Sequence, residues 1–208
     1  MKSNIYLSLV ALFLLLSCNG CYVERNMPTK YYWYNGKKIP LTPVSAESYI
    51  LIDPNVFDVS SFPEVKDFHL LDNYLYPKTY EGKRNLLYGI LKRGFSKKIY
   101  NKKGVIYHSP SYIVGGSDNP TGVTHLFNAK LKPGVSYSQL EELAKKYNVE
   151  ILGNNNLMPL WYTFACTKKS AGDAIDMANA FYESGLCIYA EPVIMHTIII
   201  DDSEHETI

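Results

Sequence analysis

The side chains that most often carry chemistry are scattered in this sequence. It has four cysteines and five histidines, and no spacing among them indicates a zinc site. We find no GxSxG turn for a serine nucleophile, no HExxH metal motif and no phosphate-binding loop. The acidic run at residues 201–208 could hold a cation weakly, but such a run is more typical of a solvated chain end. We therefore expect no catalytic residue, no metal and no cofactor. A lone histidine on a strand, such as His125, is expected to be a structural residue.

Cys18 is the cysteine for which the pattern best predicts a modification, and Cys21 is a weaker candidate. Residues 7–16 form an apolar run behind a positive N-terminus. The run is shorter than the ~20 residues of a membrane span and is typical of a secretory signal. It ends in Leu-Leu-Ser-Cys, the pattern of a bacterial lipobox. We expect residues 1–17 to be the signal peptide, residues 18–30 a tether, and Cys18 the lipid attachment site. The alternative is an ordinary cleaved signal peptide without a lipid.

The lipid would place the protein in the cell envelope, by expectation in the outer membrane, with the side it faces left open. Acyl chains buried in a bilayer hold a protein at the membrane without spanning it. The net charge is +1, although lysine and arginine pairs make the middle of the chain locally basic. A nucleic-acid partner would require a recognition motif as well, and we find none. A solvated basic face is the expected role of these pairs, and the oligomeric state is not predicted.

Tyrosine is unusually frequent, with 18 residues, and is densest at residues 31–34. Asn35-Gly36 follows this cluster and predicts a two-residue hairpin turn. Tyr32, Trp33 and Tyr34 form a candidate aromatic patch that could stack on a sugar or enter a pocket of a partner. Alternatively, these rings alternate along a strand and cover a small core.

The region 31–121 is predicted to be a smaller, irregular α+β region that contains the aromatic hairpin. A strand is expected at residues 48–53 and another at residues 105–114, with Pro110 marking an edge or a bulge. Residues 84–93 have apolar side chains at helical spacing and a glycine after them, which predicts a helix.

Residues 122–200 predict strand, helix, strand, strand, helix and strand in that order. Ser136 and Gln139 have the form of a capping box for the first helix, and Asn148 ends it. Ser170 is the expected N-cap of the second helix, and Gly185 follows its end. This order predicts a ferredoxin-like domain, in which two helices cover one face of a four-stranded antiparallel sheet. The overall fold class is therefore α+β.

Cys166 and Cys187 fall on the third and fourth strands of this predicted domain. The usual strand order, 4-1-3-2, inserts the first strand between them. Adjacent strands lie ~4.8 Å apart, so the two Cα atoms would be ~10 Å apart, beyond the ~7 Å limit of a disulfide. We expect two free thiols.

Three segments resemble one protein family. They are YYWYNGKKIPL (31–41), MPLWYTFACTKKS (158–170) and DAIDMANAFYESGLCIYAEP (173–192). In these segments the chain resembles the N-terminal prodomain region of lipid-anchored bacterial subtilisin-like serine proteases, whereas residues 54–120 match poorly. The resemblance implies a ferredoxin-like domain that packs on a protease, with a C-terminal tail in the substrate cleft. The Asp, His and Ser motifs of the catalytic domain are absent from the sequence, so we expect a stand-alone relative of the prodomain.

Three functions remain open at this stage. The first is a module that binds, inhibits or chaperones a subtilisin-like protease in trans. Its candidate contact tail comprises Val193, Ile194, Met195, His196, Thr197 and Ile198, which suit an extended strand. These residues could equally continue the domain's own last strand. The second function is adhesion to a glycan or protein through the aromatic patch, because fold alone does not fix function. The third is a degenerate prodomain relic.

Overall fold

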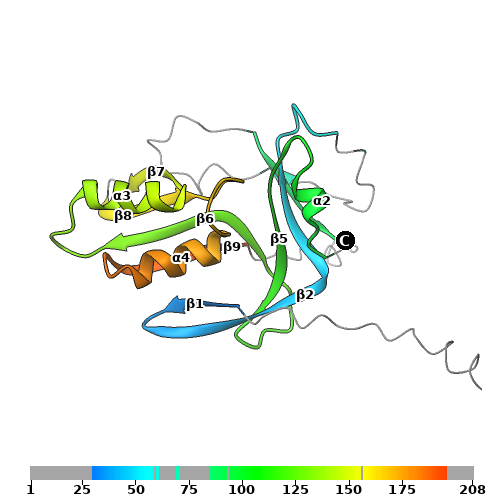
Figure 1. Ribbon diagram of the computed structural model, residues 1–208. Coiled ribbons are helices and arrows are strands. Elements are labelled where there is room, and N and C mark those ends of the chain that lie inside the picture. The colour runs from blue at the N-terminus through cyan, green and yellow to red at the C-terminus, as the bar shows by residue number, and fades with distance from the viewer. Residues whose placement is uncertain are drawn as a thin grey trace, which may run out of the picture.

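Two antiparallel sheets and three helices form the described part of the protein (Figure 1). The computed structural model describes residues 30–58, 60, 69–70, 85–92, 94–155 and 157–195. The first sheet has the order β1-β2-β4-β3, with β5 also paired to β2, and the second has the order β7-β8-β6-β9. The fold is α+β, as predicted. The strands are β1 (Lys30–Tyr34), β2 (Lys37–Ile52), β3 (His69–Leu70), β4 (Leu87–Leu91), β5 (Val105–Val114), β6 (Gly122–Leu131), β7 (Glu150–Asn155), β8 (Met158–Ala165) and β9 (Cys187–Met195). The helices are α2 (Lys97–Tyr100), α3 (Tyr137–Tyr147) and α4 (Ala174–Glu183).

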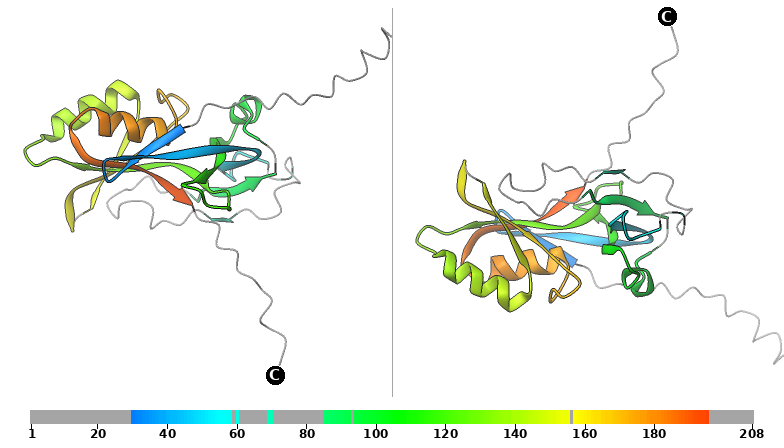
Figure 2. Two further views of the ribbon diagram at one scale, coloured as in Figure 1. Left: turned by 90° about the horizontal axis from the view of Figure 1, so that it is seen from below. Right: turned by 90° about the horizontal axis from the view of Figure 1, so that it is seen from above.

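The C-terminal sheet has the strand order expected from the sequence, and α3 and α4 lie on one of its faces (Figure 2). Ser136 and Gln139 form the predicted capping box, and Asn148 ends α3 with a left-handed backbone. The predicted start of α4 is wrong by one turn. Asp173, not Ser170, accepts the first free amides of the helix. The Ser170 hydroxyl instead donates to the Asn148 carbonyl at 2.7 Å, which ties the loop before α4 to the end of α3.

The predicted helix at residues 84–93 is wrong, because its centre is strand β4. Leu91 of β4 lies opposite Ser48 of β2, and Leu87 lies opposite Ile52. Leu91 is fully buried in a second, smaller core cluster. Apolar residues at these spacings fit either a helix face or a buried strand, and pairing with β2 decides between them.

Strand β2 organises the first sheet, because it pairs with β1, β4 and β5. Its first residues pair with β1 through a hairpin whose turn residues, Asn35 and Gly36, both have positive φ, as the predicted turn requires. Its last residues pair with β4 on one side and β5 on the other. The register of β2 against β5 shifts between Val44 and Ser48, beside Pro110, which was expected to mark an edge or a bulge.

One hydrophobic core runs across both sheets. It contains residues of β2 and β5 together with those of β6, β8, α3 and α4. At its centre, the ring of Phe127 stacks on Phe164 at 4.8 Å, and Phe181 of α4 meets both rings edge-on. The two halves of the chain therefore share their buried interior.

Cys166 and Cys187 are free and buried, as predicted. They lie on opposite sides of β6 and beside different positions along that strand. The Cys166 amide donates to the carbonyl of His125, whereas Cys187 pairs with Leu131. Burial raises the pKa of the Cys187 thiol to about 12, which makes it an inert core residue. Among the described residues, no helix is long and apolar enough to cross a membrane.

Candidate functional site

The first half of the predicted contact tail belongs to a strand of the protein's own sheet. Ile194 and Met195 end β9 and pair with Val123 and Gly122 of β6. Val193 packs against the main core. These three residues therefore take the alternative position left open by the sequence. His196, Thr197 and Ile198 lie outside the described residues, as do Cys18 and the acidic run.

The aromatic hairpin divides its rings between two faces. Tyr31 and Trp33 turn toward α4, where both donate to the carboxylate of Glu183, at 3.0 and 2.9 Å. The Trp33 ring stacks on Tyr182 with centroids 5.0 Å apart. The hydrogen bond from Trp33 is the main cause of the lowered pKa of Glu183. Of the predicted patch, Trp33 therefore helps to hold the hairpin on α4.

Tyr32 and Tyr34 occupy the other side of the hairpin. Tyr32 packs against the main core, whereas Tyr34 is 48% exposed. Of the three rings in the predicted patch, Tyr34 is the one left open to solvent.

Replacing Trp33 with alanine is expected to lower the free energy of unfolding by about 1–2 kcal/mol, because a ring stack and a hydrogen bond to a charged group are both lost. Tyr34→Ala is the matched control and should change it by no more than about 0.5 kcal/mol. Urea unfolding of the two variants measures the difference. Equal effects would show that the contacts with α4 do not hold the hairpin.

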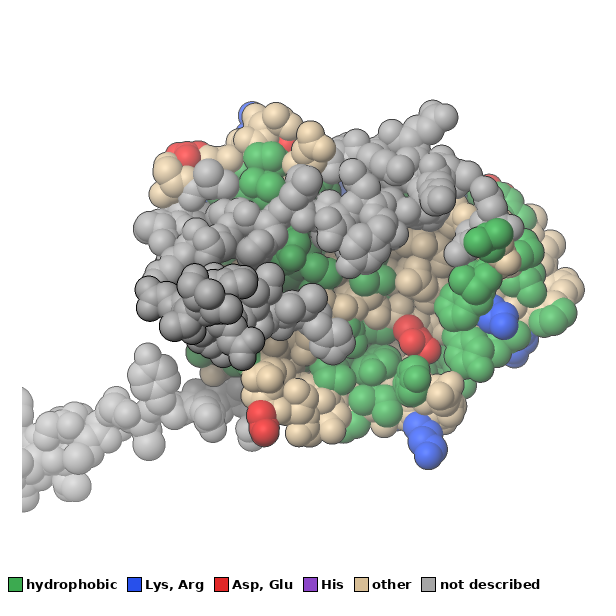
Figure 3. All heavy atoms as spheres, turned by 180° about the vertical axis from the view of Figure 1, so that it is seen from behind, with side chains coloured by type: hydrophobic (Ala, Val, Ile, Leu, Met, Phe, Trp, Pro, Cys, Tyr) green, Lys and Arg blue, Asp and Glu red, His purple; other side chains and the backbone are tan. Residues whose placement is uncertain are grey.

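The face of the C-terminal sheet opposite the helices carries an aromatic row that sequence analysis missed. Trp161 of β8 and Tyr189 of β9 both lie opposite Lys130 of β6. Their rings are parallel within 2°, with centroids 6.1 Å apart, and the Lys130 ammonium lies 5.9 Å from each. All three side chains are partly exposed. Figure 3 shows hydrophobic side chains gathered on this rear face.

The alternation of inward-facing and outward-facing side chains along the strands is the sequence signal that could have predicted this row. Phe127, Ala129 and Phe164 face the core, so their neighbours in the sequence must face away from it. In the next row along the sheet, Thr163 donates to Asn128 at 2.8 Å. Glu191 lies on the other side of Asn128, and burial raises the pKa of its carboxyl group.

A cavity of about 360 Å³ lies where the two sheets meet. Lys30, the first described residue, lies at its wall and binds Asp173 at 2.5 Å and Asp176 at 3.0 Å. Burial alone would lower the pKa of Lys30, but the attraction of the two carboxylates is larger, so its pKa lies above the ordinary value. Burial also raises the pKa of Asp173. The ion pairs fasten the start of β1 to the start of α4. The other lining residues are Phe95, Tyr100, Tyr107, His108, Ser109, Pro110, Tyr112, Thr167, Lys168, Ser170 and Gly172.

A buried serine and histidine also meet, although the sequence separates them by 60 positions. The Nε2 atom of His108 lies 2.9 Å from the Ser48 hydroxyl. Such a pair can activate a nucleophile. Ser48 is fully buried, however, so a substrate cannot approach its oxygen in this structure. Burial also lowers the pKa of His108 to about 4. The contact is a structural hydrogen bond. Within the described ranges, no three acidic, histidine or cysteine side chains are grouped to hold a metal.

Comparison with known proteins gives no relative from which a role could be transferred. No protein-family model, curated protein or solved structure matches the chain.

Proposed function

We propose that this protein is a lipid-anchored, non-catalytic module that binds a subtilisin-like protease in trans. In this proposal, residues 122–200 form a ferredoxin-like prodomain-type unit, and Cys18 holds the protein at the cell envelope. Binding either inhibits the protease or assists its folding. The sequence resemblance in residues 31–41 and 158–192 suggests the class of partner.

The face of the C-terminal sheet opposite α3 and α4 is the observation that carries the proposal. Trp161, Lys130 and Tyr189 form a partly exposed row on that face. Aromatic rings that are rigidly placed and only partly buried are typical of protein-binding hot spots. Lys130 and Glu191 add charges of both signs at the same face, which would orient a partner.

The position of β9 supports inhibition of the protease by the segment that follows Met195. β9 lies at the edge of the sheet order, and the chain continues beyond Met195 for 13 residues. The first of these, His196 to Ile200, are rich in β-branched side chains, which favour an extended conformation. An extended segment can add to a protease as a strand in its substrate cleft. The sheet face would supply affinity, and the segment after Met195 would block the cleft.

Titration of subtilisin-like proteases tests the proposal. The chain lacking residues 1–18 is added to each protease, and hydrolysis of a chromogenic peptide is followed. We expect saturable inhibition by the unaltered chain. The double variant W161A/Y189A should weaken it at least about 30-fold, because each ring is a hot-spot candidate. The control Tyr137→Ala removes an exposed ring at the start of α3, on the opposite side of the sheet, and should leave inhibition unchanged.

A truncation after Met195 separates the roles of the two surfaces. It keeps all of β9, so the domain remains intact, and it should abolish inhibition while leaving binding through the sheet face. Absence of inhibition by the unaltered chain, or its simple digestion as a substrate, would rule out an inhibitor. If the unaltered chain binds a glycan or a surface protein and the Tyr34→Ala variant does not, adhesion is favoured instead.

A further inference from the structure

Six exposed lysines gather at one end of the molecule although they come from separate parts of the chain. Four lie on α2 and in the turn after it, and two lie in the loop before α4, about 70 positions later. The loop is tied to the turn, because the Lys168 ammonium donates to the Lys102 carbonyl at 3.1 Å. The Lys168 ammonium also lies 5.4 Å from the centre of the Tyr100 ring on α2. The members of this lysine cluster are Lys97, Lys98, Lys102, Lys103, Lys168 and Lys169.

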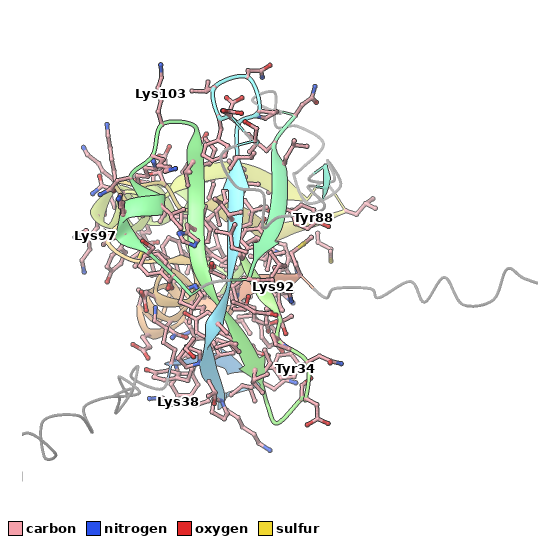
Figure 4. All side chains as sticks on the ribbon, turned by 90° about the vertical axis from the view of Figure 1, so that its right-hand side faces the viewer. Tyr34, Lys38, Tyr88, Lys92, Lys97 and Lys103 are labelled. Atoms are coloured by element: carbon pink, nitrogen blue, oxygen red, sulfur yellow. The ribbon has the colours of Figure 1, made fainter. Side chains whose placement is uncertain are left out.

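Four of these lysines have no ion-pair partner in the part of the chain that the structure describes. Among the described residues, Lys97, Lys98, Lys103 and Lys169 make no ion pair, whereas Lys30 and Lys92 do. Figure 4 shows Lys97 on α2 and Lys103 beyond it, both pointing away from the protein. Such a surface attracts anions through the sum of its charges.

Exposed apolar side chains border the cluster. Phe95, directly before α2, is 45% exposed, and its ring lies 6.4 Å from that of Tyr100. Val56 is 46% exposed in the turn at residues 53–57, whose Asp53 amide donates to the carbonyl of Gly104. Aromatic and aliphatic groups beside lysines are the combination that settles at the boundary between lipid head groups and acyl chains.

The start of the described chain lies beside the cluster. Lys30 lines the same cavity as Phe95, Tyr100 and Lys168. Residues 19–29 separate Lys30 from Cys18 and can span at most about 40 Å when extended. A lipid on Cys18 would therefore keep Lys30 within about 40 Å of the membrane, which allows this end to reach it.

We propose that the lysine cluster and Phe95 form a second membrane contact, which binds the head groups of anionic phospholipids. The inference shares the lipid anchor with the proposed function but needs no protease. Acyl chains combined with a basic surface hold a protein more firmly than either alone. The contact would also fix which side of the protein faces the bilayer.

Sedimentation with lipid vesicles tests the contact without the lipid anchor. The chain lacking residues 1–18, which keeps every described residue, is mixed with vesicles of phosphatidylcholine alone or with added phosphatidylglycerol. We expect binding only to the anionic vesicles, with loss at high salt. The variant K97Q/K98Q/K103Q/K169Q should bind at least about tenfold more weakly. The control K37Q/K132Q/K145Q/K146Q removes the same charge from exposed positions elsewhere and should bind as the unaltered chain does.

Phe95→Ala supplies an independent test that leaves the charge unchanged. It should weaken binding to anionic vesicles several-fold at a salt concentration where the lysines still act. Equal binding to neutral vesicles, or equal weakening in both lysine variants, would overturn the proposal. Retention on heparin without vesicle binding would also overturn it, because the cluster would then serve a soluble polyanion.

Discussion

Replacing Phe181 with alanine is expected to lower the free energy of unfolding by about 3–5 kcal/mol. Phe181 is fully buried on α4, and its ring contacts Phe127 and Phe164 at 4.9 and 4.8 Å. The substitution removes the apolar contacts of a whole ring and leaves a cavity between the helices and the sheet. Because small domains are stable by only about 5–15 kcal/mol, the variant should be only marginally folded.

Urea unfolding at neutral pH measures this effect. The control, Phe181→Leu, keeps most of the volume and should cost less than about 1.5 kcal/mol. With Trp161 replaced by phenylalanine in every variant, the fluorescence of Trp33 would report on the hairpin. Far-ultraviolet circular dichroism would report on the helices. Since both halves share one core, the two signals should change together. A loss below about 1 kcal/mol, or separate transitions, would contradict a shared core.

Acid is expected to destabilise the fold strongly between about pH 6.5 and pH 4 because of two buried histidines. Burial lowers the pKa of His125 to about 4, and that of His108 likewise. In the unfolded chain these rings take up protons near their ordinary pKa of about 6.5. Their stabilising contribution is therefore complete above that pH and is lost as the pH falls toward 4. Each unit of difference corresponds to about 1.4 kcal/mol, so each ring accounts for up to about 3 kcal/mol.

Unfolding free energies measured at several pH values test this expectation. His125→Gln should flatten the slope between pH 6.5 and pH 4, even though it lowers stability at neutral pH. Two partly buried carboxyl groups oppose the trend, because burial raises the pKa of Asp173 and Glu191 and acid relieves their charge. An unchanged slope in the variant would show that His125 is not the group that titrates.

Local sequence patterns predicted the C-terminal half of the fold well. The capping box at Ser136 and the left-handed Asn148 depend on residues that are adjacent in the chain, so their physics is visible in the sequence. The free thiols followed from strand order alone. The N-cap of α4 was misplaced because Ser170 and Asp173 are both good caps, and only Asp173 directs its carboxylate at the helix amides.

Features that depend on distant partners could not be predicted in the same way. Residues 87–91 became β4 because β2 lies beside them, and nothing local indicates that neighbour. The lysine cluster depends on the bond from Lys168 to Lys102, and the Ser48–His108 contact spans 60 positions. Strand alternation could have predicted that Trp161 and Tyr189 share a face, but it could not have predicted that their rings are parallel.

The packing of the hairpin on α4 has a consequence for the order in which the protein forms. Lys30 and Trp33 belong to the first strand, yet their partners Asp173 and Glu183 follow 143 and 150 positions later. A growing chain emerges from the ribosome N-terminus first. β1 therefore cannot make these contacts until α4 has been synthesised. Long-range contacts of this kind slow folding. Throughout that delay, the densest aromatic segment of the chain lacks its docking surface, which makes it the segment that most needs shielding in the nascent chain.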